Sequence, residues 1–339
     1  MKCSRKHFLS MILILCGIFL FLNGCTLPAS DVSVPQSHSF FALDTYITLT
    51  IYDAGRQNLY DSGEQLVRDY ESLFSATLPG SDIYQINHAG GEWVTVSDET
   101  IALLRTALDY CAHSEGSLDI TILPVKTLWN FTGEAPVVPS ETDLQAALSH
   151  VSYQNIEIDG NNVCLRDPSA MIDLGFIAKG YICDRLREHL IENGVTSALL
   201  ALGGNISVIG TKPDGASYKV GIQKPFAELG TPITTVSLSD SSSEGKKEYS
   251  CAVTSGIYER YFEQDGQIYH HIIDPVTGYP VENDLSSVTI LSDSSTVGDA
   301  LSTLCLSMGL EKATAYIEAQ EHVEAVFITR DDQRIVHAY

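Results

Sequence analysis

An acidic residue and a lysine flank a glycine-containing turn in the segment 173–181. Asp173 and Gly175 follow an apolar run, and Lys179 lies where an amphipathic helix should begin. The first N–H groups of a helix have no partner within it, and a nearby lysine adds positive charge. The arrangement therefore favours an anion site, with a simple ion pair between Asp173 and Lys179 as the alternative.

A carboxylate and a hydroxyl lie one helical turn apart near residue 300. Asp299 and Thr303 are i and i+4, so both side-chain oxygens project from one face of the predicted helix. Hard oxygen ligands of this kind suit Mg²⁺, with carbonyls, water or phosphate completing the shell. Asp299 also lies near the predicted helix start, where it could simply act as a cap.

Two adjacent histidines precede a tight turn. Successive side chains of a strand point to opposite faces, so only one of His270 and His271 can enter a given cleft. An imidazole is basic enough near neutral pH to accept a proton, and Asp274 is the next candidate base. The strand exits at 203–205 and 254–256 carry glycines and hydroxyls that could approach phosphate or could simply make turns.

These segments must be positioned by a mixture of strands and helices. The alternation of strands and helices has no regular βαβ rhythm, so we expect a single α+β domain rather than a doubly wound sheet. Apolar spacing predicts helices over 58–74, from a Ser97 cap to Gly116, from a Ser140 cap, before Gly194, and from 296 and 310. Strands are predicted over 40–53, 156–165 (a hairpin), 171–174, 198–202, 218–223, 233–238, 249–254, 268–274 and 286–291, and near 326 and 335.

The N-terminal segment has the order of a secretory signal. A basic start and an apolar run over 8–22, too short to span a bilayer comfortably, precede Gly24 and Cys25. We therefore expect a lipoprotein held at the extracytoplasmic face of the cell membrane, with a transmembrane anchor as the alternative. The expected parts are a signal peptide over 1–24, a tether over 25–39 that begins at a diacylated Cys25, and a domain over 40–339.

The composition limits the possible partners. The chain has 43 acidic against 20 basic residues, a net charge of −23, and no basic run, which argues against nucleic acid. After Cys25 the cysteines are odd in number and form no CxxC pair, so buried free thiols are expected rather than disulfides. They are Cys111, Cys164, Cys183, Cys251 and Cys305.

Taken in order, these segments resemble the FAD:protein FMN transferases, the ApbE family. The similarity covers nearly all of the chain after the tether, in motifs at 43–45, 74–87, 118–129, 173–179, 203–205, 271–280 and 299–303. The resemblance implies that FAD lies in a cleft of a single domain. It implies FAD contacts at Leu43, Thr77, Leu118, Asp119, Asp173, Lys179, Thr254, Ser255 and Ile272, and a metal site at Asp299, Thr303 and the Phe176 carbonyl.

The implied reaction is Mg²⁺-dependent transfer of the FMN half of FAD onto a threonine or serine of a separate acceptor protein, with release of AMP. His271 would be the general base, and Lys179 with Mg²⁺ would neutralise the leaving phosphate. Thr77 falls where some members carry an aromatic residue that stacks on the flavin, so a metal-dependent FAD pyrophosphatase stays an alternative. A solute- or flavin-binding lipoprotein is the non-enzymatic alternative, and the combination of metal ligands, histidine and lysine argues against it.

Overall fold

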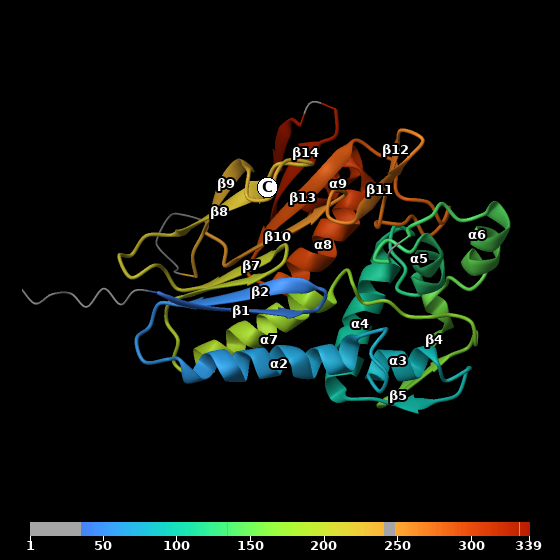
Figure 1. Ribbon diagram of the computed structural model, residues 1–339, viewed down its shortest axis with the longest axis horizontal. Coiled ribbons are helices and arrows are strands. Elements are labelled where there is room, and N and C mark those ends of the chain that lie inside the picture. The colour runs from blue at the N-terminus through green and yellow to red at the C-terminus, as the bar shows by residue number, and fades with distance from the viewer. Residues whose placement is uncertain (1–34, 134, 241–247, 332) are drawn as a thin grey trace, which may run out of the picture. The chain divides into compact units, whose positions relative to one another are not determined.

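An antiparallel sheet forms the centre of the molecule (Figure 1). The computed structural model describes residues 35–133, 135–240, 248–331 and 333–339, and Pro35–Tyr339 form one compact unit. Within these residues, eight strands pair antiparallel in the order β1-β2-β6-β7-β10-β13-β14-β15. They are β1 (Gln36–Ala42), β2 (Thr45–Ile51), β6 (Ala198–Leu202), β7 (Asn205–Ile209), β10 (Cys251–Gly256), β13 (Leu285–Ser292), β14 (Glu324–Thr329) and β15 (Ile335–Ala338).

Three smaller antiparallel sheets accompany the central one in the described part of the chain. One of them, the β8–β9 hairpin, packs its apolar residues against one face of the central sheet, with Tyr218 and Leu238 beside Ala252 of β10. Their strands are β3 (Val94–Thr95), β4 (Ile156–Asp159), β5 (Asn162–Leu165), β8 (Tyr218–Gln223), β9 (Pro232–Leu238), β11 (Tyr261–Gln264) and β12 (Gln267–His270).

Helices cover the opposite face of the central sheet. Val253 of β10 faces Gly298 of α8, so alternation along β10 separates the helix side from the hairpin side. Helix α7 packs beside α8, and α2 packs on α7 (Figure 1). The helices are α2 (Asn58–Phe74), α3 (Asp82–Asn87), α4 (Asp98–His113), α5 (Leu123–Trp129), α6 (Glu141–Leu148), η1 (Tyr153–Asn155), α7 (Ala178–Glu192), α8 (Ser295–Met308) and α9 (Leu310–Glu318).

The expected α+β class is confirmed, and so are two helix starts. The Ser97 hydroxyl accepts a hydrogen bond from Thr100 N, and the Ser140 hydroxyl accepts one from Asp143 N. Each bond satisfies one of the N–H groups that the first turn leaves without a partner. The five cysteines after Cys25 are buried free thiols, as expected.

The expected single strand over 40–53 is wrong, because the chain makes a hairpin there. Leu43 and Asp44 both adopt φ of 55°, a left-handed conformation that ends β1 and starts β2. Residues 36–39, expected in the tether, belong to β1 and pair with β2. The two strands merge in the sequence because neither turn residue is a glycine or proline, the usual signals of a tight turn.

Two other strand expectations need correction. The segment 171–174 forms only an isolated parallel bridge between Met171 and Ile122, so it is an extended connection and not a strand of a sheet. The strand expected over 268–274 ends at His270, which places His271 in the bend after β12.

No helix in the described part of the chain is long and apolar enough to cross a membrane. The expected signal peptide, Cys25 and the tether up to residue 34 lie outside the described residues.

Candidate functional site

Two helices hold each other's first turns where α7 and α8 meet. Asp299 of α8 accepts a hydrogen bond from Gly180 N, in the first turn of α7, at 2.8 Å. In return, Asp184 of α7 accepts bonds from the N–H groups of Ser295 and Thr296 at 2.7 and 2.9 Å. First-turn N–H groups carry the positive end of the helix dipole, so each carboxylate stabilises the helix it faces. The start of α8 is thereby fixed against the start of α7.

Asp299 is not the cap of its own helix, so the capping alternative is wrong in that form. The Ser294 hydroxyl caps α8 by accepting a bond from Val297 N. Asp299 lies one turn further on and is 3% exposed. Burial raises the pKa of Asp299, while Lys179, 3.7 Å away, and the Gly180 N–H offset part of this effect.

A row of hydroxyls lies on the face of α8 that turns toward β10. Ser255 is 9% exposed, and its hydroxyl lies 2.8 Å from the Ser302 hydroxyl and 3.1 Å from the Thr303 hydroxyl. Thr254 faces the other side of the sheet, where its hydroxyl lies 2.8 Å from that of Thr289 on β13. Ser255 therefore joins the Asp299–Thr303 cluster, and the Thr254 side chain does not.

Asp173 pairs with Lys126 of α5, so the alternative of a simple Asp173–Lys179 ion pair is wrong. Although burial opposes ionisation, the charge of Lys126 and hydrogen bonds from Lys126 and Gly175 N lower the pKa of Asp173. Lys179 instead contacts Asp299 and donates to the Gly175 carbonyl at 3.3 Å. The two lysines thus hold two buried or half-buried carboxylates on either side of the 173–177 turn.

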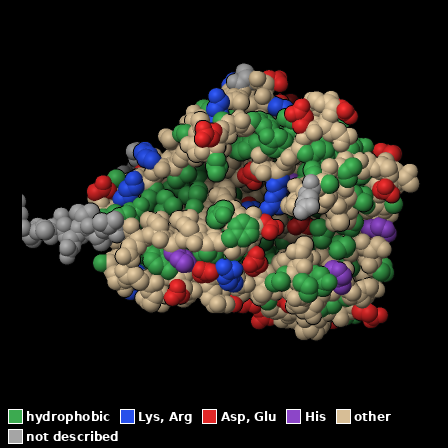
Figure 2. All heavy atoms as spheres, in the orientation of Figure 1, with side chains coloured by type: hydrophobic (Ala, Val, Ile, Leu, Met, Phe, Trp, Pro, Cys, Tyr) green, Lys and Arg blue, Asp and Glu red, His purple; other side chains and the backbone are tan. Residues whose placement is uncertain are grey.

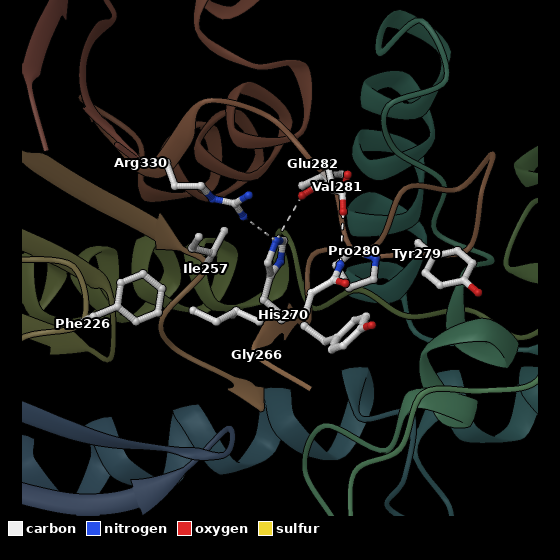
Figure 3. A pocket seen from close by; sticks show the side chains of 12 residues that line it. Phe226, Ile257, Gly266, His270, Tyr279, Pro280, Val281, Glu282 and Arg330 are labelled. Atoms are coloured by element: carbon white, nitrogen blue, oxygen red, sulfur yellow. Dashed lines mark hydrogen bonds between the residues drawn. The ribbon is translucent and has the colours of Figure 1, made fainter. Parts of the chain in front are cut away.

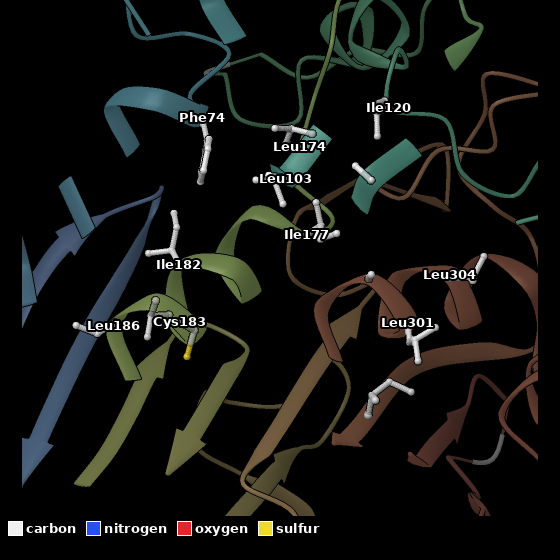
Figure 4. Packing of buried hydrophobic residues seen from close by; sticks show 14 of the residues in the cluster. Phe74, Leu103, Ile120, Leu174, Ile177, Ile182, Cys183, Leu186, Leu301 and Leu304 are labelled. Atoms are coloured by element: carbon white, nitrogen blue, oxygen red, sulfur yellow. The ribbon is translucent and has the colours of Figure 1, made fainter. Parts of the chain in front are cut away.

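The 173–177 turn is anchored in the main core. Leu174 and Ile177 are 2% and 0% exposed and point toward the same core as Leu103 of α4 (Figure 4). Asp173 N donates to the Ile120 carbonyl at 2.7 Å, which fixes the start of the turn. Burying two large aliphatic side chains contributes roughly 3–6 kcal/mol, enough to hold the polar residues between them in one arrangement.

His271 lies in the bend after β12, where the charge of Lys126, the partner of Asp173, acts on it. Its backbone N and its Nδ1 both lie within hydrogen-bonding distance of the Arg260 carbonyl, at 3.1 and 3.3 Å. A carbonyl only accepts, so Nδ1 carries the proton and Nε2 keeps its lone pair. Burial lowers the pKa of His271 well below its usual range, and the charges of Lys126 and Arg260 add to this shift. The imidazole is therefore neutral near pH 7 and able to accept a proton.

The β1–β2 turn lies at the other end of the same region. Leu43 N donates to Glu71 at 2.7 Å, and a Cβ at Gly203 would lie 2.8 Å from the Thr45 hydroxyl. The β6–β7 turn thus packs closely on the β1–β2 turn. A Cβ on the neighbouring Gly204 would lie 3.5 Å from a Glu259 carboxylate oxygen. The charges of Lys179 and Asp299 act on Glu259 in turn, so Glu259 connects these turns with the cluster around Asp299.

The other residues expected to contact FAD differ in their surroundings. The Asp119 carboxylate accepts bonds from Thr121 N, the Thr121 hydroxyl and Tyr153 N, at 2.8, 2.6 and 2.9 Å. Leu118 is 8% exposed, and its N–H donates to the Ser114 hydroxyl. Thr77 is exposed in the loop after α2, and the Ile272 carbonyl accepts from Val281 N.

The donor set at Asp299 fits a hard divalent cation such as Mg²⁺. Among the described residues, no group of three or more His, Cys, Asp or Glu side chains could hold a metal. One buried carboxylate, the Thr303 hydroxyl and a main-chain carbonyl are nevertheless the ligand types that Mg²⁺ accepts alongside phosphate and water. The Phe176 carbonyl is the expected main-chain ligand, and Gly180 N, which would bond to it in a regular helix, donates to Asp299.

Lys126, Glu259 and Asp184 are site residues that sequence reasoning missed. Desolvation raises the pKa of Glu259, and the Asp299 carboxylate adds to this while Lys179 opposes it. Lys126 lies far from Asp173 in sequence, inside an ordinary-looking helix. The only local signal was polar residues next to predicted motifs: Glu259 follows 254–256, and Asp184 lies on the helix that Lys179 begins.

Comparison with known proteins connects this arrangement to a family. A model of the ApbE family matches residues 43–327. The chain belongs to the ApbE family. A curated ApbE relative from Klebsiella pneumoniae (strain 342), described as FAD:protein FMN transferase, is 37% identical over 270 residues, covering 79% of this chain and 81% of that protein.

Solved ApbE structures share the fold. The crystal structure of the ApbE protein of Thermotoga maritima matches with a TM-score of 0.80 and 29% identity, covering 90% of this chain and 97% of that one. The apo form of the flavinyl transferase ApbE from Pseudomonas stutzeri matches with a TM-score of 0.76 and 28% identity, covering 90% and 94%. The mixed sheet-and-helix domain is thus the ApbE fold, in a family of flavin transferases.

Proposed function

We propose that the chain transfers the FMN half of FAD onto a threonine or serine hydroxyl of a separate protein and releases AMP, with Mg²⁺ bound at Asp299. The acceptor oxygen forms a bond to the FMN phosphorus, and the phosphoanhydride bond to the AMP phosphate breaks. The hydroxyl proton goes to His271 Nε2. Family membership supports the reaction class, and the cluster of Asp299, Thr303 and Lys179 at the start of α7 supports this chemistry.

The bound cation would be held by Asp299, Thr303 and the Phe176 carbonyl, and it would neutralise negative charge that develops on the phosphates. Lys179 adds positive charge at the same point, next to the N–H groups of the α7 first turn. Lys126 lowers the pKa of Asp173, and burial together with the charges of Lys126 and Arg260 lowers that of His271, so the base is neutral before it accepts the hydroxyl proton. FAD would lie in the hollow on the face drawn in Figure 2, where basic, acidic and apolar side chains meet.

The reaction can be tested with purified protein, FAD, MgCl₂ and a candidate acceptor. Covalent flavin fluorescence on a denaturing gel reports transfer, and chromatography reports AMP. The proposal requires one AMP for each flavin attached. Equimolar FMN and AMP with no labelled protein, for every acceptor tried, would instead establish a pyrophosphatase. A structural reason would be that the exposed Thr77 offers no aromatic ring to stack on the flavin.

Substitution of Asp299 tests the metal site. Asp299→Ala removes the one buried carboxylate of the cluster, so we expect the Mg²⁺ concentration for half-maximal rate to rise by about 10-fold or more. Glu311→Ala, an exposed acidic residue in the first turn of α9, is the matched control. An Asp299→Ala protein with full activity at limiting Mg²⁺ would contradict the assignment.

We also propose that the protein is a lipoprotein of the extracytoplasmic membrane face, anchored through Cys25. The order of basic start, apolar run and Gly24-Cys25 supports this proposal. Cys25→Ser should abolish labelling by a radioactive fatty acid and release the protein from the membrane fraction or leave it unprocessed. Unchanged labelling would contradict the proposal.

A further inference from the structure

A cavity of about 370 Å³ lies beside β12, away from the cluster around Asp299. Its walls come from β12, the segment after the 274–279 turn, the loop before β9 and the end of β14 (Figure 3). None of Asp173, Lys179, His271 or Asp299 lines it. Ligand pockets in proteins begin at about 300 Å³, so the space is large enough for a small organic molecule.

His270 lies in the wall of this cavity. Its side chain points between Arg330 and Val281 (Figure 3), and the residue is 1% exposed. Nε2 donates to the Val281 carbonyl at 3.2 Å, so Nδ1 is the acceptor, and it has no hydrogen-bond partner among the described residues. Burial lowers the pKa of His270 to about 4, and the charge of Arg330 adds to the shift. The ring is therefore neutral and adds no charge of its own to the wall of the cavity.

Arg330 gives the cavity a positive charge. Its guanidinium is half-buried and lies 3.5 Å from His270 Nε2. No carboxylate of the described residues lies within ion-pair distance of it, although the chain carries a net charge of −23. Glu282 lines the cavity but is exposed and lies 3.3 Å from Gln267 Nε2. The guanidinium therefore remains available for a carboxylate or phosphate.

Aromatic side chains complete the walls. Tyr269 and Tyr279 line the cavity, and Phe226 lies at its mouth with 42% of its surface exposed. Phe226 adopts φ of 56°, an unfavourable conformation for a residue with a side chain. Its ring packs edge to face with that of Tyr261, with the two ring centroids 5.3 Å apart. Flat walls of this kind suit a planar apolar body.

We propose that this cavity binds a small organic anion with a planar apolar body, at a site separate from the flavin transfer site. The anionic group pairs with Arg330, and the planar body lies between the aromatic side chains. His270 lines the cavity and His271 does not, so a ligand here contacts the residue next to the base without entering the transfer site.

The binding can be measured by calorimetry on the full chain with 2-naphthoate, which has both features. The neutral amide 2-naphthamide is the matched probe. We expect the amide to bind more weakly by about tenfold or more, because it loses a charge-assisted bond to Arg330. Equal affinity for the acid and the amide would overturn the proposal.

Variants separate this site from adventitious binding. Arg330→Gln should weaken the binding of 2-naphthoate by about tenfold or more, whereas Arg334→Gln, on the same β14–β15 turn but outside the cavity wall, should leave it unchanged. Glu282→Gln removes the nearby negative charge and should tighten binding. Unchanged affinity in Arg330→Gln, or displacement of the probe by FAD, would overturn the proposal, because the cavity would then be inert or part of the flavin site. The FAD KM of Arg330→Gln should equal that of the unmodified chain.

Discussion

The environment of His271 makes it a base and not an acid at neutral pH. Burial and the positive charges of Lys126 and Arg260 all lower the pKa of its imidazole. The Arg260 carbonyl accepts the Nδ1 proton, so Nε2 is the atom that can accept a second one. A group with a lowered pKa gains its proton only when the pH falls below that lowered value, so the base stays active in mildly acidic solution.

His271→Ala should keep FAD binding and lose transfer by roughly 10²–10⁴-fold, the usual contribution of a general base. Single-turnover kinetics with saturating FAD, together with a direct FAD titration, separate the two effects. Lost FAD affinity with unchanged turnover of bound FAD would make His271 a binding contact and Asp274 the next candidate base.

The variant Lys126→Gln tests the role of His271 through the rate–pH profile, which would not shift if His271 had a purely structural role. Removing this cation should raise the pKa of His271 toward its ordinary value, so the acid limb of the rate–pH profile should shift to higher pH. Lys212→Gln, remote from His271 in the β7–β8 connection, is the control. An unmoved acid limb in Lys126→Gln would mean that another group titrates.

For single residues, the sequence predicted which residues form the site better than it predicted which residues they contact. Asp299 and Thr303 share a face because helical periodicity places i and i+4 together, and that geometry is local. The partners of Asp299 and Asp173 are Gly180 and Lys126, which the fold brings from distant positions. The local sequence pattern carries no information on such pairs, and for that reason it left open an Asp173–Lys179 ion pair that the fold does not form.

The helices α7 and α8 approach so closely that one position must lack a side chain. A Cβ at Gly180 would lie 2.7 Å from the Asp299 Cβ and would also clash with the Ser295 carbonyl. The carboxylate of Asp299 reaches the α7 first turn only at this separation. The glycine therefore sets the position of the proposed metal ligand as well as the packing of the two helices.

Gly180→Ala should destabilise the protein by about 1–3 kcal/mol, because backbone on α8 must move to admit a methyl group. It should also raise the Mg²⁺ requirement, since Asp299 moves with α8. Gly63→Ala in α2 is the control: its Cβ would lie 3.1 Å from the ends of the Leu186 and Leu49 side chains, which can rotate away. Denaturant unfolding and Mg²⁺ titration of both variants measure the difference, and equal effects would contradict this role for Gly180.

Elements with a clear period and a cap were predictable, and elements set by tertiary contacts were not. Helix α2 was predicted with its observed limits, 58–74, because its apolar face is regular. The β1–β2 turn was missed because Leu43 and Asp44 adopt positive φ without a glycine, held by the Glu71 bond to Leu43 N. The segment 171–174 reads as a strand but lies beside Ile122 in a single bridge, so its conformation comes from neighbours in space.

Over the whole molecule, stability is tied to the protonation of buried histidine. His270 has a folded-state pKa of about 4, against 6.5 in the unfolded chain. Between pH 4 and pH 6.5 the unfolded chain binds more protons than the folded chain. The contribution of His270 to the free energy of unfolding is therefore fully present above pH 6.5 and is lost as the pH falls toward 4. By this linkage, His270 alone removes about 2 kcal/mol between pH 7 and pH 5.

His270→Gln should reduce this loss, because an amide can still donate to the Val281 carbonyl and does not titrate. Urea unfolding of both proteins at pH 7 and pH 5 gives the four free energies needed. The unmodified chain should lose about 2 kcal/mol more than the variant over this interval. Equal losses would show that His270 is not the responsible group.

The exchange of carboxylates between α7 and α8 has a further consequence for how the molecule opens. Because Asp299 binds Gly180 N and Asp184 binds the N–H groups of Ser295 and Thr296, neither helix can fray at its start without releasing the other. The two first turns should therefore form one cooperative unit in native-state hydrogen exchange. Their amide protons should exchange with one shared opening free energy, and Asp184→Ala should speed exchange at Gly180 as well as at Ser295. Faster exchange confined to the start of α8 would show that the two helices open independently.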